Sequence, residues 1–252
     1  MSGVLTRLMT AALLSGLLSP AASAQGDGGV YQAVMIRAAP GRLLDLIDSI
    51  KARLPVYQAA GEPKPVLLRH AQGDQWDLVL LVPVASVADH QGRDYQSRWE
   101  SALHRTGFDD AAFKRHQDDW ISWQEELYVT GPPVAAFQSA VASAGYFHLE
   151  IMQALAGKRD SLLAERQMEN DFLARTGRPT NFIFRKITGP AWDIFTVGFY
   201  RDLQHYAEPS RVTAEEEDAA ARAAGFASRG HIGPYLRQLI GSHHDTLGSI
   251  VR

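Results

Sequence analysis

The chain contains no cysteine, and this absence excludes several kinds of chemistry. Without thiols there is no disulfide, no thiolate nucleophile, and no cysteine-ligated zinc or iron–sulfur cluster. A basic run is also missing, because 25 Lys and Arg stand against 28 Asp and Glu, for a formal net charge of −3. Nucleic-acid-binding proteins typically concentrate positive charge on one face. Nucleic acid is therefore not an expected partner.

Long apolar runs are scarce as well, and the one candidate is N-terminal. Arg7 precedes an apolar stretch from Leu8 to Leu18, followed by Pro20 and the small residues 22–24. This order is typical of a secretory signal peptide, and the run is shorter than the roughly 20 residues that span a bilayer. We predict a signal peptide at residues 1–24, a periplasmic or secreted product, and no stable membrane insertion after cleavage. The alternative is an uncleaved anchor.

The sequence contains an internal repeat. The rare pair Trp76-Asp77 recurs as Trp192-Asp193, an offset of 192 − 76 = 116 positions. At this offset, six identities fall within the 17 positions from 61 to 77, where chance would give about one. The other four identities are Gly61 with Gly177, Pro63 with Pro179, Arg69 with Arg185, and Gly73 with Gly189.

Each copy has the same predicted order of elements. Hydrophobic periodicity and turn residues predict strand, helix, two strands joined by a glycine turn, helices, and a closing strand. In the first copy these elements are expected at residues 31–37, 41–57, 66–71, 78–82, 85–104, 110–123 and 126–130. In the second copy they are expected at residues 146–152, 158–173, 181–187, 194–199, 214–224, 232–240 and 245–251. We therefore expect a first repeat at 29–130, a linker at 131–144, and a second repeat at 145–252.

This element order is the split βαβ of ferredoxin-like units, so the predicted fold class is α+β. Two such units in tandem resemble the dimeric α+β barrel superfamily, whose sheets pack face to face. Duplicated members of that superfamily include chlorite dismutase-like and dye-decolorising-peroxidase-like haem proteins. Single-copy members include cofactor-independent monooxygenases, muconolactone isomerase-like enzymes and NIPSNAP-type proteins. The resemblance implies that one chain supplies both halves of the barrel, and no motif selects one branch.

Strand alternation divides the first strand of the second copy into two faces. Phe147, Leu149 and Ile151 form one face, which we expect to pack under the helices. The other face carries Tyr146, His148, Glu150 and Met152, where the first copy has Val30, Gln32, Val34 and Ile36. An imidazole and a carboxylate thus replace an amide and a valine. Fold maintenance does not require that change, and a buried charge needs a partner.

The C-terminus offers partners for this pair, because Ser242, His243, His244 and Asp245 begin the predicted last strand. In the ferredoxin-like order the last strand lies beside the first, which would bring these groups near His148 and Glu150. The corresponding residues 123–125 of the first copy include no histidine. We therefore predict that the second repeat is the chemical half and the first is scaffold.

The leading hypothesis is a small-molecule enzyme that uses acid–base catalysis in an apolar barrel pocket without a cofactor. His148 or His244 would be the base, with Glu150 or Asp245 as its orienter or acid. Arg185 would bind an anionic group of the substrate. Tyr146, Trp192 and His243 would complete the binding site, and these aromatic groups favour a hydrophobic or aromatic substrate. Lyase, isomerase and cofactor-independent oxygenase reactions all fit this group.

Three alternatives remain open. Haem binding would use His231 or His205 as the axial ligand. A divalent metal would use two histidines and a carboxylate, although His243 and His244 point to opposite faces of a regular strand. A non-catalytic periplasmic binding protein, with or without homodimerisation, would need none of these. Structural roles are also expected, with Trp76 and Trp192 in the core and with Arg69 and Arg185 paired to Asp77 and Asp193.

Overall fold

The computed structural model describes residues 28–252, so the predicted signal peptide lies outside the described residues. The first half contains β1 (Val30–Ala38), α1 (Leu43–Ala59), β2 (Val66–Gln72), β3 (Leu78–Val84), α2 (Val87–His90), α3 (Arg93–Thr106), α4 (Asp110–Trp120) and β4 (Ile121–Thr130). The second half contains β5 (Tyr146–Ala154), α6 (Arg159–Arg175), β6 (Phe182–Thr188), β7 (Ile194–Tyr200), α7 (Leu203–Tyr206), α8 (Ala214–Ala223), the 3-10 helix η1 (Arg229–His231), α9 (Ile232–Arg237) and β8 (Ile240–Ile250). The predicted α+β class is confirmed.

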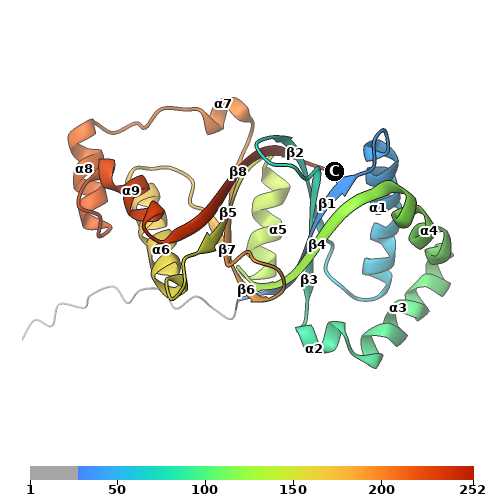
Figure 1. Ribbon diagram of the computed structural model, residues 1–252. Helices are drawn as coiled ribbons and strands as arrows, with labels where there is room; N and C mark the ends of the chain where they lie inside the picture. The colour runs from blue at the N-terminus through green and yellow to red at the C-terminus, as the bar shows by residue number, and fades with distance from the viewer. Residues whose placement is uncertain (1–27) are drawn as a thin grey trace, which may run out of the picture.

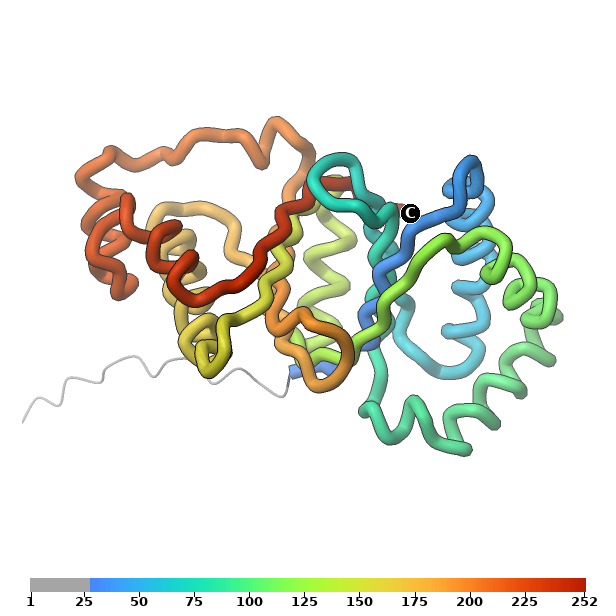
Figure 2. The backbone as a smooth tube through the Cα atoms, in the orientation of Figure 1, coloured from blue at the N-terminus to red at the C-terminus, as the bar shows by residue number. Residues whose placement is uncertain are grey.

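The eight strands form one closed antiparallel barrel in the order β1-β3-β2-β8-β5-β7-β6-β4. Each half supplies four consecutive strands of this order, and the halves join where β2 pairs with β8 and β4 pairs with β6. Helices cover the outside of each half, with α1, α3 and α4 on one side of Figure 1 and α6, α8 and α9 on the other. The trace in Figure 2 shows the last strand running from the helices of the second half to the seam beside β2.

The barrel interior is a packed apolar core shared by both halves. Phe147, Leu149 and Ile151 are fully buried in it, together with Tyr31 and Phe184 from other strands. The prediction that this face of β5 packs under the helices is therefore wrong. Closing two sheets into a barrel buries their inner faces against each other. The strand face with the larger continuous set of apolar side chains therefore points inward. The face with His148 and Glu150 points outward, and the predicted barrel pocket is filled by side chains.

The segment predicted as a linker contains an unpredicted helix, α5 (Val134–Ser143). This helix lies between the two sheets in Figure 1. Phe137 of α5 is fully buried, and its ring contacts those of Tyr31 and Phe184 edge-on at centroid distances of 5.7 and 5.3 Å. The connection between the halves therefore adds to the core of the barrel.

The repeated Trp-Asp pair has the same structural role in both halves. An oxygen of Asp77 accepts a hydrogen bond from the backbone N–H of Ala38 at 2.8 Å, and Asp193 accepts one from Ala154 at 2.9 Å. Each aspartate thus satisfies a backbone donor at the end of the first strand of its unit. Trp76 is 1% exposed, which confirms it as a core residue.

The repeated arginines do not pair with these aspartates, so that prediction is wrong. Lys186 Nζ lies 3.3 Å from Asp193 Oδ1 instead, while Arg69 and Arg185 are exposed. The aspartates turn toward the strand ends, whereas the arginines project from the outer face of β2 and β6.

Each glycine hairpin crosses the last strand of the other half. Gly73 has a φ of 125°, and a Cβ at this position would clash with the carbonyl oxygen of Asp245 in β8. Gly189 has a φ of 129°, and a Cβ there would lie 2.5 Å from Cβ of Leu127 in β4. Both repeated glycines are therefore required at the two seams that close the barrel.

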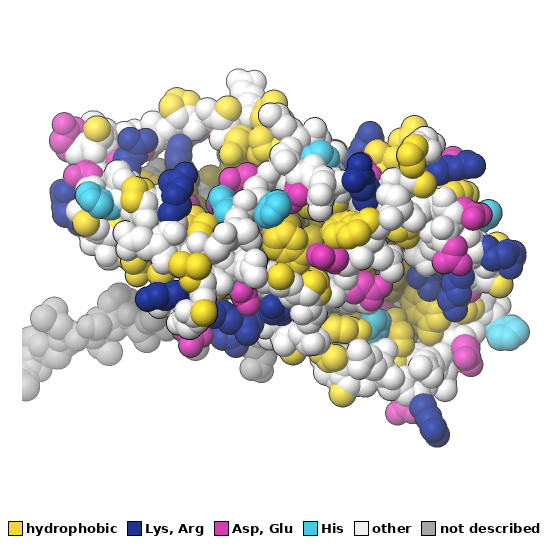
Figure 3. Space-filling model, in the orientation of Figure 1, with side chains coloured by type: hydrophobic (Ala, Val, Ile, Leu, Met, Phe, Trp, Pro, Cys, Tyr) yellow, Lys and Arg dark blue, Asp and Glu magenta, His cyan; other side chains and the backbone are white. Residues whose placement is uncertain are grey.

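The space-filling view of Figure 3 shows charged side chains of both signs spread over this face. Hydrophobic side chains reach the surface mainly at the centre of the view, where the two halves meet. Among residues 28–252, no helix combines the length and apolar character needed to cross a membrane.

Gly189→Ala tests the seam between β4 and β6. We expect a loss of about 2–4 kcal/mol in the free energy of unfolding, because the new Cβ combines an unfavourable φ with a steric clash. Gly61→Ala is the matched control, since Gly61 also has a positive φ (77°) but no other atom within 4 Å of the place a Cβ would take. The control should lose only about 1–2 kcal/mol. Equal losses in urea denaturation of the two variants would contradict the role assigned to the seam.

Candidate functional site

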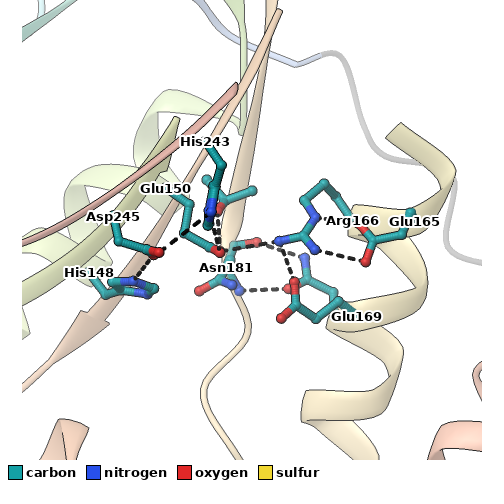
Figure 4. A network of polar contacts seen from close by, with 10 residues as sticks. His148, Glu150, Glu165, Arg166, Glu169, Asn181, His243 and Asp245 are labelled. Carbon is teal, nitrogen blue, oxygen red and sulfur yellow. Dashed lines mark hydrogen bonds and ion pairs between the residues drawn. The ribbon is translucent and has the colours of Figure 1, made fainter. Parts of the chain in front are cut away.

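The predicted site residues of β5 and β8 meet on the outer face of the second sheet. In the antiparallel register, Glu150 lies directly opposite Asp245, and Met152 lies opposite His243. Because side chains alternate along a strand, His148 and Glu150 share this face with His243 and Asp245. Figure 4 shows the four side chains converging. The predicted adjacency of the last strand and the first strand of this repeat is thus present.

His243 lies between two carboxylates. Its Nε2 is 3.3 Å from Oε1 of Glu150, and its Nδ1 is 3.6 Å from Oδ2 of Asp245. His148 Nε2 lies 2.9 Å from the other oxygen of Asp245, Oδ1. The chain of contacts therefore runs from His148 through Asp245 and His243 to Glu150.

Arg166 of α6 continues this chain into the protein. It is 2% exposed, and its Nη1 donates to Glu150 Oε2 at 3.2 Å. Its Nε and Nη2 bind both oxygens of Glu165 at 2.6 and 2.8 Å, and Nη1 also lies 2.5 Å from Glu169 Oε2. Thr196 donates its hydroxyl to the same Oε2 of Glu150 at 3.0 Å. One oxygen of Glu150 is thus held in place, and the other faces His243.

Negative charge is in excess here. Four carboxylates contact Arg166 or the two histidines, and with all four ionised and both imidazoles neutral the formal charge is 1 − 4 = −3. Burial raises the pKa of Glu150, but the hydrogen bond with His243 and the charge of Arg166 outweigh it and lower the pKa to about 2. The hydrogen bond to Glu150 outweighs burial at His243 and raises its pKa.

Glu169 responds in the opposite direction. Burial raises its pKa, the charge of Arg166 lowers it, and the neighbouring carboxylates Glu150 and Glu165 raise it again, to about 7. Its short contact with Arg166 favours the ionised form, but one guanidinium cannot compensate the three carboxylates around it, two of which are buried. We therefore assign the raised pKa to Glu169.

Glu150, His243 and Asp245 could hold a metal ion. Each offers one ligand atom, and these atoms lie within 4.8 Å of one another. This is the only group of three or more potential ligands found in the part of the chain that the structure describes. The second oxygen of each carboxylate is hydrogen-bonded to a residue outside this group of three. Arg166 and Thr196 bind Glu150, and His148 binds Asp245. Such outer hydrogen bonds orient the ligands of metal sites.

Other predicted site residues lie elsewhere. His244 points to the inner face, where its Nδ1 is 3.3 Å from Oδ2 of Asp74 and its ring meets Trp192 edge-on. Trp192 is half-buried, and its Nε1–H donates to Glu125 at 2.6 Å. His244 does not reach the cluster, because a one-residue step along β8 reverses the face. Trp192, in the turn before β7, contacts His244 and Glu125 instead.

Two further predicted residues share the outer face. Tyr146 lies at the end of β5, with its ring centroid 6.5 Å from that of Tyr206 in α7. The Tyr206 ring is in turn 5.3 Å from that of His148, so aromatic groups border the histidine. Arg185 projects from β6, on the far side of β7 from the cluster, and lines a separate cavity.

Sequence reasoning missed the residues that α6 contributes. The repeat offset of 116 carried the signal, because Arg166 stands where the first copy has Ile50 and Glu169 where it has Arg53. Thr196 likewise replaces Leu80. A charge in place of an isoleucine on the buried side of a helix points to a polar partner beneath it. Tyr206 belongs to a segment with no clear pattern, and nothing in the sequence placed it beside His148.

Neither histidine predicted as an axial ligand lies in a site that fits a haem. His231 is exposed, and its Nδ1 lies 2.7 Å from the Ser228 hydroxyl oxygen. His205 accepts a hydrogen bond from the backbone N–H of Arg201 and lines a cavity of about 310 Å³. That volume is at the lower limit for small-molecule sites, and haem is among the larger cofactors.

No protein-family model and no curated protein matches the chain in sequence. Among solved structures, an anthrone oxidase-like protein is similar over 90% of this chain and 92% of its own, with a TM-score of 0.57 and 10% identity. The chain has the fold of the dimeric α+β barrel superfamily. The resemblance predicted from element order is thus confirmed at the level of fold.

Two other solved structures match with TM-scores below 0.5. A chlorite dismutase variant from Candidatus Nitrospira defluvii scores 0.49 at 12% identity, covering 89% of this chain and 92% of its own. A haem-binding protein from Thermus thermophilus scores 0.41 at 14% identity, covering 89% and 92%. At such identities the likeness concerns the fold alone, and fold does not determine function.

Glu169→Gln tests the charge balance around Arg166. The pKa of Glu169 is higher in the folded chain (about 7) than its ordinary value of 4.5, so its contribution to stability is complete below pH 4.5 and is lost as the pH rises through 7. This one group should lower the free energy of unfolding by about 2–3 kcal/mol between pH 5 and pH 8.5. The variant should lack that decrease.

Urea denaturation at both pH values, with a chelator present, measures the effect. Asp171→Asn is the control, because Asp171 forms an exposed i,i+4 pair with Arg175. It should show the same pH dependence as the unmodified chain. A Glu169→Gln variant that loses as much stability as the unmodified chain at high pH would contradict the assignment.

Proposed function

We propose that the protein is an exported enzyme that acts on a small molecule with the help of a divalent cation bound by Glu150, His243 and Asp245. The observation that carries this proposal is the convergence of three ligand atoms within 4.8 Å on two adjacent strands. The export part rests on the signal-like order of residues 1–24.

The orientation of the carboxylates supports a metal site. Arg166 and Thr196 bind Oε2 of Glu150, and His148 binds Oδ1 of Asp245. The remaining oxygens, Oε1 and Oδ2, both turn toward the ring of His243. Two carboxylates that are each held through one oxygen and direct the other toward His243 bring the three ligand groups together, which reduces the entropy lost on metal binding.

The electrostatics also favour a cation. A divalent ion would offset the excess of negative charge in the cluster. One imidazole and two carboxylates suit zinc, manganese or iron(II), and three protein ligands leave a position for water or substrate. An ion bound there would supply a Lewis acid and lower the pKa of a bound water. His148, held by Asp245 through Nε2, would border that position and could exchange a proton with the substrate.

The surroundings favour a hydrophobic or aromatic substrate. Tyr206 lies beside His148, and its ring is 5.1 Å from that of Tyr200 and 6.5 Å from that of Tyr146. Aromatic faces next to a small polar group are typical of sites that bind apolar molecules with one reactive polar function.

A second candidate is acid–base catalysis without a metal. It is favoured by the 2.9 Å contact between His148 and Asp245, which resembles a base held by an orienting carboxylate. Lyase, isomerase or cofactor-independent oxygenase chemistry would then centre on His148. Chelation separates the candidates, because a metal-free mechanism keeps its turnover when the cation is removed. A panel of small aromatic esters, lactones and enolisable ketones would supply the substrates for that comparison.

His243→Ala tests the proposed ligand set by isothermal titration of the chelator-treated protein with zinc or manganese. We expect one ion per chain and a loss of roughly 100-fold or more in affinity for the variant, because one of three ligands is removed. His148→Ala should lose roughly 10- to 100-fold, as an outer partner of Asp245.

His244→Ala is the matched control, since His244 is the next residue along β8 but points to the opposite face. It should keep the affinity of the unmodified protein. The proposal fails if neither metal binds more tightly than about 1 mM, or if His244→Ala and His243→Ala lose affinity equally.

A further inference from the structure

A cavity of about 530 Å³ lies at the other edge of the same outer face, beside α6 and β6. Its volume is within the range of sites that hold small organic molecules. Apolar side chains, including Leu163 and Ile183, form part of its wall, and the amides of Gln167, Asn170 and Asn181 form another part. The cavity therefore offers apolar contact together with a few polar groups.

Arg185 is the one charged residue that lines this cavity, and no Asp or Glu among residues 28–252 does. It projects from the outer face of β6 and is exposed. Within the same described range, its guanidinium makes no ion pair or side-chain hydrogen bond at the distances used for the other arginines. Glu165 and Glu169 of α6 are directed toward Arg166, as Figure 4 shows, and Asp171 pairs with Arg175. The local charge at the cavity is positive.

Two hydrogen bonds hold together the wall between the cavity and the charged cluster. Asn170 of α6 donates to the backbone oxygen of Asn181 at 2.7 Å and accepts from its backbone N–H at 2.7 Å. This two-way bond ties α6 to the segment that leads into β6. A wall held in this way keeps the cavity formed without a ligand, which lowers the cost of binding.

We propose that this cavity binds a small organic anion, with the carboxylate on Arg185 and an apolar body against Leu163 and Ile183. A guanidinium with no competing acid can bind a carboxylate through two parallel hydrogen bonds. The neighbouring amides can donate to the same group. β7 separates Arg185 from β5, so this binding site does not depend on the proposed metal and can be measured without turnover.

Sodium benzoate is a suitable probe, and benzamide is its neutral counterpart of the same shape. In isothermal titration with a chelator present, we expect saturable binding of benzoate and much weaker binding of benzamide. Arg185→Met should weaken benzoate binding about tenfold or more, since a charged hydrogen-bond partner is lost.

Arg69→Met is the matched control, because Arg69 is the repeat counterpart of Arg185, is also exposed, and lies outside the lining of this cavity. It should leave the affinity unchanged. Amide chemical shifts should move in residues 163–185 of the unmodified protein and not in the Arg185→Met variant.

Three results would each overturn the inference. These are no saturable benzoate binding up to about 10 mM, equal affinity for benzoate and benzamide, and equal losses in the two arginine variants. Because the titration is done without metal, its failure leaves the metal proposal standing, and the failure of metal binding leaves this inference standing.

Discussion

A buried guanidinium organises the polar face of the second unit. Arg166 is 2% exposed and contacts Glu150, Glu165 and Glu169 at once. Removing these charges from water is costly, and the cost is offset only while every contact is made. Arg166 therefore dictates that Glu150 points one oxygen inward and the other toward His243. Without Arg166, the outer face of β5 would need apolar side chains under α6, as the first half has in the apolar cluster around Val34.

Two halves with one backbone plan thus have different outer faces. The first half places Val34, Leu80 and Ile50 where the second places Glu150, Thr196 and Arg166. Both halves keep what the barrel itself requires: a glycine at each seam and an aspartate at each strand end. The duplication therefore separates these structural residues, which repeat, from the residues of the charged cluster around Arg166, which do not. The cavity beside Arg185 adds a second polar feature to the same half, on the far side of β7.

The sequence predicted that the last strand of the second repeat lies beside its first strand, because ferredoxin-like topology brings these two strands together. This adjacency places His148 and Glu150 near the C-terminal residues of the chain. It could not decide which face of β5 points inward. Both faces carry large side chains, and only the packing of two sheets selects the apolar one. It could not separate His243 from His244 either, since that choice depends on register. Arg166 was missed because a charged residue in a helix is usually solvent-exposed, and only its mismatch with Ile50 marks it.

The most direct test of this account is the position of a bound ion in crystals grown with zinc, located by anomalous diffraction at the zinc edge. The account predicts one dominant peak on the outer face of the second sheet. It should lie about 2.0–2.2 Å from Oε1 of Glu150, Oδ2 of Asp245 and a ring nitrogen of His243, with Arg166 still on Oε2. A dominant peak on the inner face beside His244 and Asp74, or crystals without any peak near Glu150, would contradict it.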